Sequence, residues 1–191
     1  MHKSKSFQLS VSFLLFASVV FAQSVAPGRH SPGKVTVSYS LDRLNRMASN
    51  QLAIWVEDDD GRYIDTLYVT RFTAEGGYTR RPDSLVEWVN VMRRSQFDQE
   101  EIDAFSAATQ QPGRYEIVWD GIDFEGNPVP HGAYVVKLEG NIYWKNRILW
   151  ECRFDVGLQR ARAQQEVFFT TPGAESMKRL VDDVVVEFRP D

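Results

Sequence analysis

The sequence predicts a mainly β protein, an Ig-like antiparallel β-sandwich with a short helical insert. Eight or nine short runs alternate apolar and polar residues and are separated by turn residues, as in sandwiches. The run "VTVSYSL" is an example, because one face carries Val35, Val37, Tyr39 and Leu41. One stretch with helical spacing interrupts the strands. We therefore expect a single domain over residues 34–191, with the insert at about residues 83–109.

The N-terminus has the pattern of a secretory signal peptide. Lys3 and Lys5 precede an apolar run over residues 11–22, and small residues stand at Val20 and Ala22. This order of basic, apolar and small residues predicts cleavage after Ala22 and a flexible leader over residues 23–33. The run is short for a membrane span, although an uncleaved anchor is the alternative. We expect no transmembrane segment in the mature chain.

Charge composition argues against a nucleic-acid partner. The chain has 22 Lys and Arg against 26 Asp and Glu, a net charge of −4. Losing residues 1–22 removes Lys3 and Lys5, which leaves 20 basic residues and a net charge of −6. The two signs are interspersed, with no basic arm or stripe in the sequence. We therefore expect no binding of nucleic acid.

The residue types that carry metal or nucleophile chemistry are few. The single cysteine, Cys152, alternates with polar residues in "RILWECRF". That pattern predicts a buried core residue, with a reactive thiol as the alternative. The acidic run at residues 57–60 lacks the spacing of a calcium loop and is interpreted as a hairpin turn. The sequence has no metal-ligand spacing, nucleophile elbow or Walker loop. We expect the acidic pair Asp182 and Asp183 to form a solvated turn. The sequence therefore predicts no enzyme.

The middle of the chain predicts a hairpin followed by two helices. Strand-like runs at residues 52–57 and 63–70 flank a turn that ends in Asp60-Gly61. A loop is expected at residues 73–82. Helical spacing then places four apolar residues on one face, behind Asp83 or Ser84 as the cap: Leu85, Trp88, Val89 and Met92. The second helix has Asp98 as its cap and Glu101 three residues later, a capping box.

The segment from Tyr115 to Gly140 resembles the Ig-like module of flagellar hook-capping proteins and related bacterial surface domains. The residues that carry this resemblance are Trp119, Asp120, Gly121, Asp123, Gly126, Val129, Pro130, Gly132 and Tyr134. Asp120 and Asp123 are expected to bind the amides of the turn, while the glycines allow a tight backbone. This pattern is typical of a sandwich hairpin and carries no chemistry.

A second resemblance covers most of the mature chain. The segments "NQLAIWVEDDDGRYIDTLYVTRF", "DAFSAAT", "QPGRYEIVWDG" and "VPHGAYVVKLE" occur in this order, with Trp88 after the first. The chain is similar to an uncharacterised family of predicted periplasmic proteins. Its members are often encoded near membrane redox proteins and flavin-attaching enzymes. The resemblance implies a periplasmic location and a role in redox metabolism.

Within that block, "DAFSAAT" resembles the acceptor sequence of the flavin transferase that links FMN to exported proteins. Asp103, Ser106 and Ala108 match the first, fourth and sixth positions, and Thr109 matches the acceptor. Ala107 stands where glycine is usual, which costs about 1–2 kcal/mol if the backbone is left-handed there. An ordinary helix end with the stop "QQPG" is the alternative interpretation. Trp88, Tyr78 and Tyr115 are candidates to stack on a flavin.

These observations together predict an exported, non-enzymatic binding or accessory protein in periplasmic redox metabolism. Thr109 is the candidate site of covalent FMN attachment for electron transfer, with Asp103, Ser106 and Ala108 as the recognition residues. The partners implied by the resemblance are a flavin transferase and a membrane redox protein. The alternative is a structural or interaction module of Ig type without a cofactor.

Overall fold

A computed structural model describes residues 30–42, 50–95, 97–143, 146–176 and 179–191. The strands within these residues are β1 Gly33–Leu41, β2 Gln51–Asp58, β3 Tyr63–Thr70, β4 Ser106–Ala107, β5 Gly113–Trp119, β6 Gly132–Tyr143, β7 Asn146–Val156, β8 Ala161–Gln164, β9 Glu166–Phe169 and β10 Val181–Pro190. The helices are α1 Arg71–Ala74, α2 Val86–Ser95 and α3 Gln99–Phe105, with short 3-10 turns η1 Gly77–Thr79 and η2 Ala174–Ser176.

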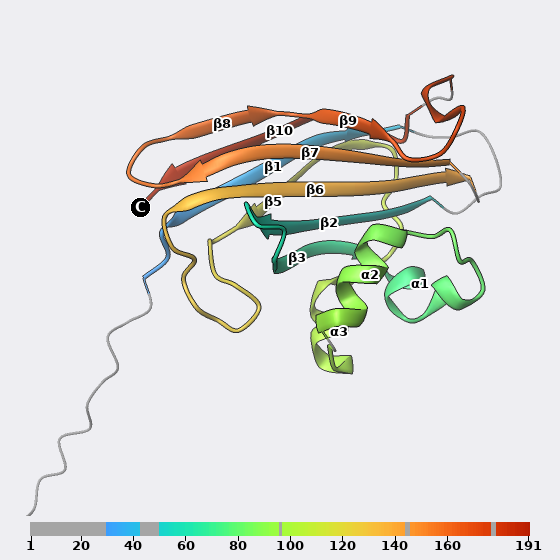
Figure 1. The fold of residues 1–191 in the computed structure, drawn as a ribbon, viewed down its shortest axis with the longest axis horizontal. Coiled ribbons are helices and arrows are strands. Elements are labelled where there is room, and N and C mark those ends of the chain that lie inside the picture. Colours follow the sequence, from blue (N-terminus) through green and yellow to red (C-terminus); the bar gives the residue numbers. More distant parts are fainter. Residues whose placement is uncertain (1–29, 43–49, 96, 144–145, 177–178) are drawn as a thin grey trace, which may run out of the picture.

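The strands form two sheets that pack face to face. One sheet has the order β5-β1-β10-β8, and the other has the order β4-β3-β2-β6-β7-β9. All neighbouring strands are antiparallel except β3 and β4, which are parallel. Figure 1 shows the three α-helices gathered beside β2 and β3. The predicted fold class, mainly β with two packed sheets and a short helical insert, is confirmed.

The main hydrophobic core lies between the two sheets. The predicted inward face of β1 is confirmed, since Val35, Val37, Tyr39 and Leu41 are all buried in this core. On β10, Val181 and Val184 both face the core although they are three positions apart, with two residues between them. A β-bulge makes this possible, because Asp183 has φ +55° and two residues of β10 lie opposite one of β1. The expected turn at residues 182–183 is therefore wrong, since these residues lie inside β10.

Strand β2 is buried on both faces. Leu52, Ile54 and Val56 pack into the main core, while Ala53 and Trp55 belong to a second cluster on the opposite face of the sheet. The helical insert covers that second face. This explains why all five residues from Leu52 to Val56 are apolar, instead of alternating with polar residues.

Helix α2, with Leu85 just before it, supplies half of the buried residues of the second cluster. Leu85, Trp88, Val89 and Met92 are buried, as their helical spacing predicts. The expected loop at residues 73–82 is only partly correct. Helix α1 ends at Ala74, which is buried in the same cluster, and η1 follows. Both elements are too short for an apolar period to reveal them.

The N-terminus of α2 is held by side chains of β6. Asn141 Oδ1 accepts a hydrogen bond from the Leu85 amide at 2.9 Å, and Glu139 Oε2 accepts one from the Trp88 amide at 3.1 Å. Asp83 contributes its carbonyl, which accepts from Asn141 Nδ2 at 2.6 Å. The expectation that Asp83 or Ser84 caps this helix therefore missed the acceptors on β6, which tertiary packing brings to these amides.

Cys152 lies in the main core, as its alternation predicts. Its side chain has no exposed surface, and burial raises the pKa of the thiol to about 12. Because the thiolate is the reactive form, a neutral buried thiol is a packing residue.

Candidate functional site

The candidate acceptor segment, residues 103–109, begins on helix α3. Asp98 and Glu101 form the predicted capping box, with Asp98 Oδ1 accepting from the Glu101 amide at 3.0 Å. Asp103 is exposed, and its Oδ1 accepts a hydrogen bond from Gln99 Nε2 at 2.9 Å. The helix therefore presents the Asp103 carboxylate to solvent.

The chain then leaves the helix as strand β4. Ser106 lies opposite Val69 and Ala107 opposite Thr70, in a parallel pairing at the edge of the larger sheet. The helical insert, which we expected to reach about residue 109, thus ends at Phe105, because β3 offers a free edge that the following backbone pairs with. Ser106 is 8 % exposed, and its buried Oγ has no hydrogen-bond partner among the described residues.

The substitution of alanine for the usual glycine at residue 107 carries no backbone penalty. Among the described residues other than glycine, only Leu85 and Asp183 have positive φ. Ala107 is instead part of an extended strand. Ala107 therefore does not have the left-handed backbone that would make alanine unfavourable at this position.

Three tyrosine side chains bind the segment around Thr109. Tyr68 Oη donates to the Ala108 carbonyl at 3.0 Å, and Tyr115 Oη donates to the Gln111 carbonyl at 2.6 Å. Tyr39 Oη donates to Gln110 Oε1 at 2.7 Å, while its ring stacks on that of Tyr115 with centroids 5.6 Å apart. We call Tyr39, Tyr68 and Tyr115 the tyrosine clasp. Burial raises the pKa of both Tyr39 and Tyr68, so these hydroxyls stay protonated donors.

Thr109 lies between the contacts of the clasp and is exposed, as is its neighbour Ala108. It also lines a small depression whose other residues are Leu41, Asn50, Leu52, Tyr68, Thr70, Gln110 and Leu180. The segment crosses here from the larger sheet, which β4 joins, to the smaller sheet, which β5 joins. The hydroxyl of Thr109 is thus attached to a backbone fixed on both sides.

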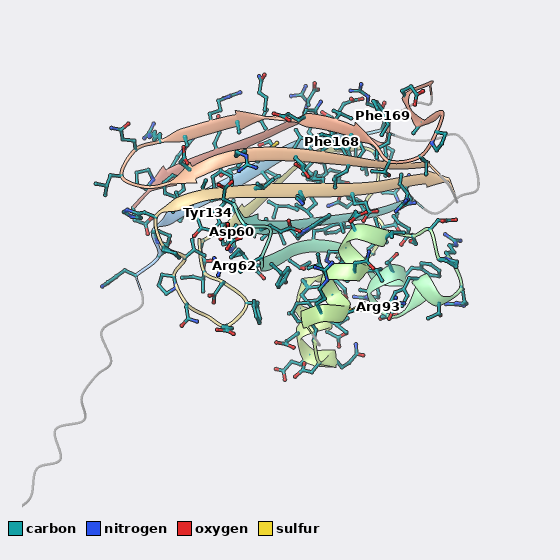
Figure 2. All side chains as sticks on the ribbon, viewed as in Figure 1. Asp60, Arg62, Arg93, Tyr134, Phe168 and Phe169 are labelled. Atoms are coloured by element: carbon teal, nitrogen blue, oxygen red, sulfur yellow. The ribbon has the colours of Figure 1, made fainter. Side chains whose placement is uncertain are left out.

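Of the three aromatic side chains considered as flavin platforms, Tyr115 binds the chain just after Thr109, at the Gln111 carbonyl, and Trp88 packs edge-on against Phe105 of α3. Trp88 has no exposed surface, and its Nε1 donates to Thr66 Oγ1 at 3.1 Å. Tyr78 lies under the guanidinium of Arg93, with 4.9 Å between Cζ and the ring centroid. Figure 2 shows Arg93 on α2, at the opposite side of the molecule from Phe168 and Phe169 on β9.

The structure therefore treats the predicted site residues differently. Ser106 lies on β4, and Ala108 and Thr109 follow it where the clasp binds the chain. Asp103, in contrast, is exposed on α3. Sequence reasoning missed Tyr39 and Tyr68. No local signal could have found them, because they lie on β1 and β3, at 71 and 40 residues from their partners.

A second hollow lies between the edges of β3 and β5. It has a volume of about 330 Å³ and is lined by Asp65, Thr66, Leu67, Ile117, Val118, Trp119 and Asp120. Burial, together with the nearby charges of Asp120 and Asp123, raises the pKa of Asp65 to about 7. Within the described part of the chain, no group of three or more His, Cys, Asp or Glu side chains is placed to hold a metal ion. No helix of that part has the length and apolar character needed to cross a membrane.

Comparison with known proteins gives one match. The model of a family described as predicted periplasmic proteins (DUF2271) matches residues 34–171. No curated protein and no solved structure matches the chain. The match agrees with the resemblance to a periplasmic family and with the expected export. The predicted signal peptide lies outside the described residues, and the hook-capping likeness and the flavin-attachment pattern stay predictions.

Proposed function

Since the chain belongs to the DUF2271 family of predicted periplasmic proteins, we propose that it is an exported redox accessory protein that carries FMN covalently on Thr109. The observation that supports this most directly is the exposed Thr109 on a backbone fixed by the tyrosine clasp. Bound FMN supplies one- and two-electron transfer. The protein is then a carrier that exchanges electrons with a membrane redox protein, and needs no catalytic constellation of its own.

The residues present fit such a group. Ala107 and Ala108 are small, so they leave space beside the Thr109 hydroxyl, and Ala108 is exposed with it. Tyr115 is half-buried, and its ring stacks on that of Tyr39. A planar ring system attached at Thr109 has this aromatic surface within the same segment, and aromatic stacking contributes to holding it.

The attachment reaction is a phosphoryl transfer to an alcohol. With a flavin dinucleotide as the donor, Thr109 Oγ1 forms a bond to the FMN phosphorus. The anhydride bond to the second nucleotide breaks, and the nucleoside monophosphate leaves with the electron pair. The hydroxyl proton passes to a base of the transferase, and no oxidation or reduction takes place in this step.

The proposal is tested by producing the full chain in a periplasm together with a flavin transferase. We expect an intact-mass increase of FMN size and a yellow protein. Thr109→Val keeps the shape of the side chain but removes the hydroxyl, so the adduct should be lost, whereas Thr109→Ser should retain it. An unmodified wild-type protein would refute the attachment and leave the alternative of an interaction module without a cofactor.

A further inference from the structure

The four residues of the acceptor pattern are not equally accessible in the folded chain. Asp103, Ala108 and Thr109 are exposed, but Ser106 is buried and its Oγ has no accessible surface. The backbone of Ser106 and Ala107 is paired with β3. An enzyme that binds this segment in an extended form and reads the Ser106 side chain cannot reach it while β4 is in place.

The contacts that hold this segment are few. Strand β4 has only two residue pairs, and none of the seven residues of α3 is fully buried. Beyond β4, the clasp holds the chain through the carbonyls of Ala108 and Gln111 and through the side chain of Gln110. Segments with few buried contacts open at a lower free-energy cost than the whole domain.

Opening also relieves a local defect of the closed form. The buried Ser106 Oγ lacks a hydrogen-bond partner among the described residues, and a buried polar group without a partner is destabilising. In the opened segment this hydroxyl is hydrated. Ser106 therefore favours the opened form, because its hydroxyl finds hydrogen-bond partners in water. An alanine at this position has no hydroxyl and would favour the closed form.

We propose that the transferase takes the acceptor segment only from an opened form, in which residues 106–111 have left β3 and the tyrosine clasp. This inference rests on FMN attachment at Thr109. The order of events is opening, transfer to Thr109 Oγ1, and closure, after which the clasp again fixes the backbone beside the modified residue. The rate of attachment then follows the opened fraction of the protein, because transfer draws on that form alone.

The test compares the removal of a tyrosine hydroxyl inside the clasp with the removal of one outside it. Tyr68→Phe removes the hydrogen bond to the Ala108 carbonyl and keeps the buried ring. Tyr134→Phe is the matched control, because Tyr134 Oη donates to the Pro130 carbonyl at 2.8 Å, at the start of β6 and away from the helices (Figure 2). Each purified, unmodified protein is incubated with transferase and flavin adenine dinucleotide, and the adduct is followed by intact mass.

We expect the initial rate of attachment to rise about fivefold in Tyr68→Phe, the effect of one typical hydrogen bond on the opening equilibrium. The Tyr134→Phe control should keep the wild-type rate. Tyr39→Phe, which removes the bond to Gln110, should raise the rate in the same direction. Hydrogen exchange of the amides at residues 106–111, measured without transferase, should rise in step with these rates.

Unchanged or lower rates in both clasp variants would overturn the opening step while FMN attachment still stood. If neither the variants nor the wild-type protein gained the adduct, both proposals would be overturned. The two failures are therefore distinguishable by the behaviour of the wild-type protein alone.

Discussion

Glu139 is a carboxyl group that the fold buries almost completely, with 1 % of the side chain exposed. Its Oε2 binds the Trp88 amide, while Oε1 has no hydrogen-bond partner among the described residues. Burial raises the pKa of Glu139 to about 7, Glu87 adds to the increase, and Arg147 opposes it. The bond to the helix amide favours the charged form, but burial is the larger effect.

This shifted pKa predicts how stability depends on pH. The carboxyl group has a pKa near 4.5 when unfolded and about 7 when folded, so the folded state binds the proton more tightly. The stabilisation is complete below pH 4.5 and is lost as the pH rises to 7. The free energy of unfolding should therefore fall over this window, by at most about 1.4 kcal/mol per pH unit for this group.

Glu139→Gln should flatten that dependence, because the amide stays neutral at every pH. The check is the urea midpoint at pH 5 and pH 8, with the exposed Glu116→Gln as a control that keeps the wild-type slope. Asp65, whose pKa burial also raises to about 7, leaves a residual slope. A variant as steep as the wild type would mean that Glu139 is charged throughout.

Several single residues could be predicted from the sequence because their roles are local. Asp98 and Glu101 form the expected capping box. Asp120 Oδ1 accepts from the Ile122 amide at 3.1 Å, and Asp123 Oδ1 accepts from the Asn127 amide at 2.7 Å, as expected for turn aspartates. In each case donor and acceptor lie within four residues of one another.

At the scale of elements, helix α2 depends on strand β6 for its N-terminus. Asn141 is buried and makes two hydrogen bonds there, one to the Leu85 amide and one to the Asp83 carbonyl. Leu85 itself has φ +49°, an unfavourable conformation for a leucine. The side chain of Asn141 therefore stabilises both the helix start and the strained residue before it.

Asn141→Ala should lower the free energy of unfolding by about 1–3 kcal/mol, because the buried Leu85 amide loses its partner and the partly buried Asp83 carbonyl loses a donor. Urea denaturation measures this change. Asn90→Ala is the control, since Asn90 is exposed on the same insert and its loss should cost less than about 0.5 kcal/mol. Equal effects of the two substitutions would contradict the capping role of β6.

Strand β4 shows where element prediction fails. The segment "DAFSAAT" has the composition of a helix end, and α3 does extend to Phe105. The next two residues are a strand only because Val69 and Thr70 of β3 leave an edge free for them. Pairing partners of this kind are tertiary, and two residues are too few to show a period of two.

At the scale of the whole molecule, β2 joins the two hydrophobic clusters, with Ile54 in one and Trp55 in the other. The insert therefore packs on a strand of the main sandwich, and we expect the two to unfold together. We expect Val89→Ala, a truncation in the second cluster, to destabilise the entire fold by about 1–3 kcal/mol. Far-UV circular dichroism and tryptophan fluorescence should keep coincident transitions.

Two separated transitions in Val89→Ala would show that the insert unfolds independently of the sandwich. The opening proposed for residues 106–111 involves fewer residues than unfolding of the insert or of the whole domain. It breaks the short pairing of β4 and the hydrogen bonds of the clasp, and leaves both clusters in place. Hydrogen exchange detects it, whereas a bulk unfolding curve does not.

The sequence alone determined the class of the fold, the face of β1 that is buried and the buried face of α2. Those features follow from the spacing of apolar residues along a single element, which needs no knowledge of its neighbours. The tertiary structure decided the bulge at Asp183, the pairing of Ser106 with Val69 and the clasp around Thr109. Each of these depends on groups that only folding brings within hydrogen-bond distance, and the candidate site is built from two of them.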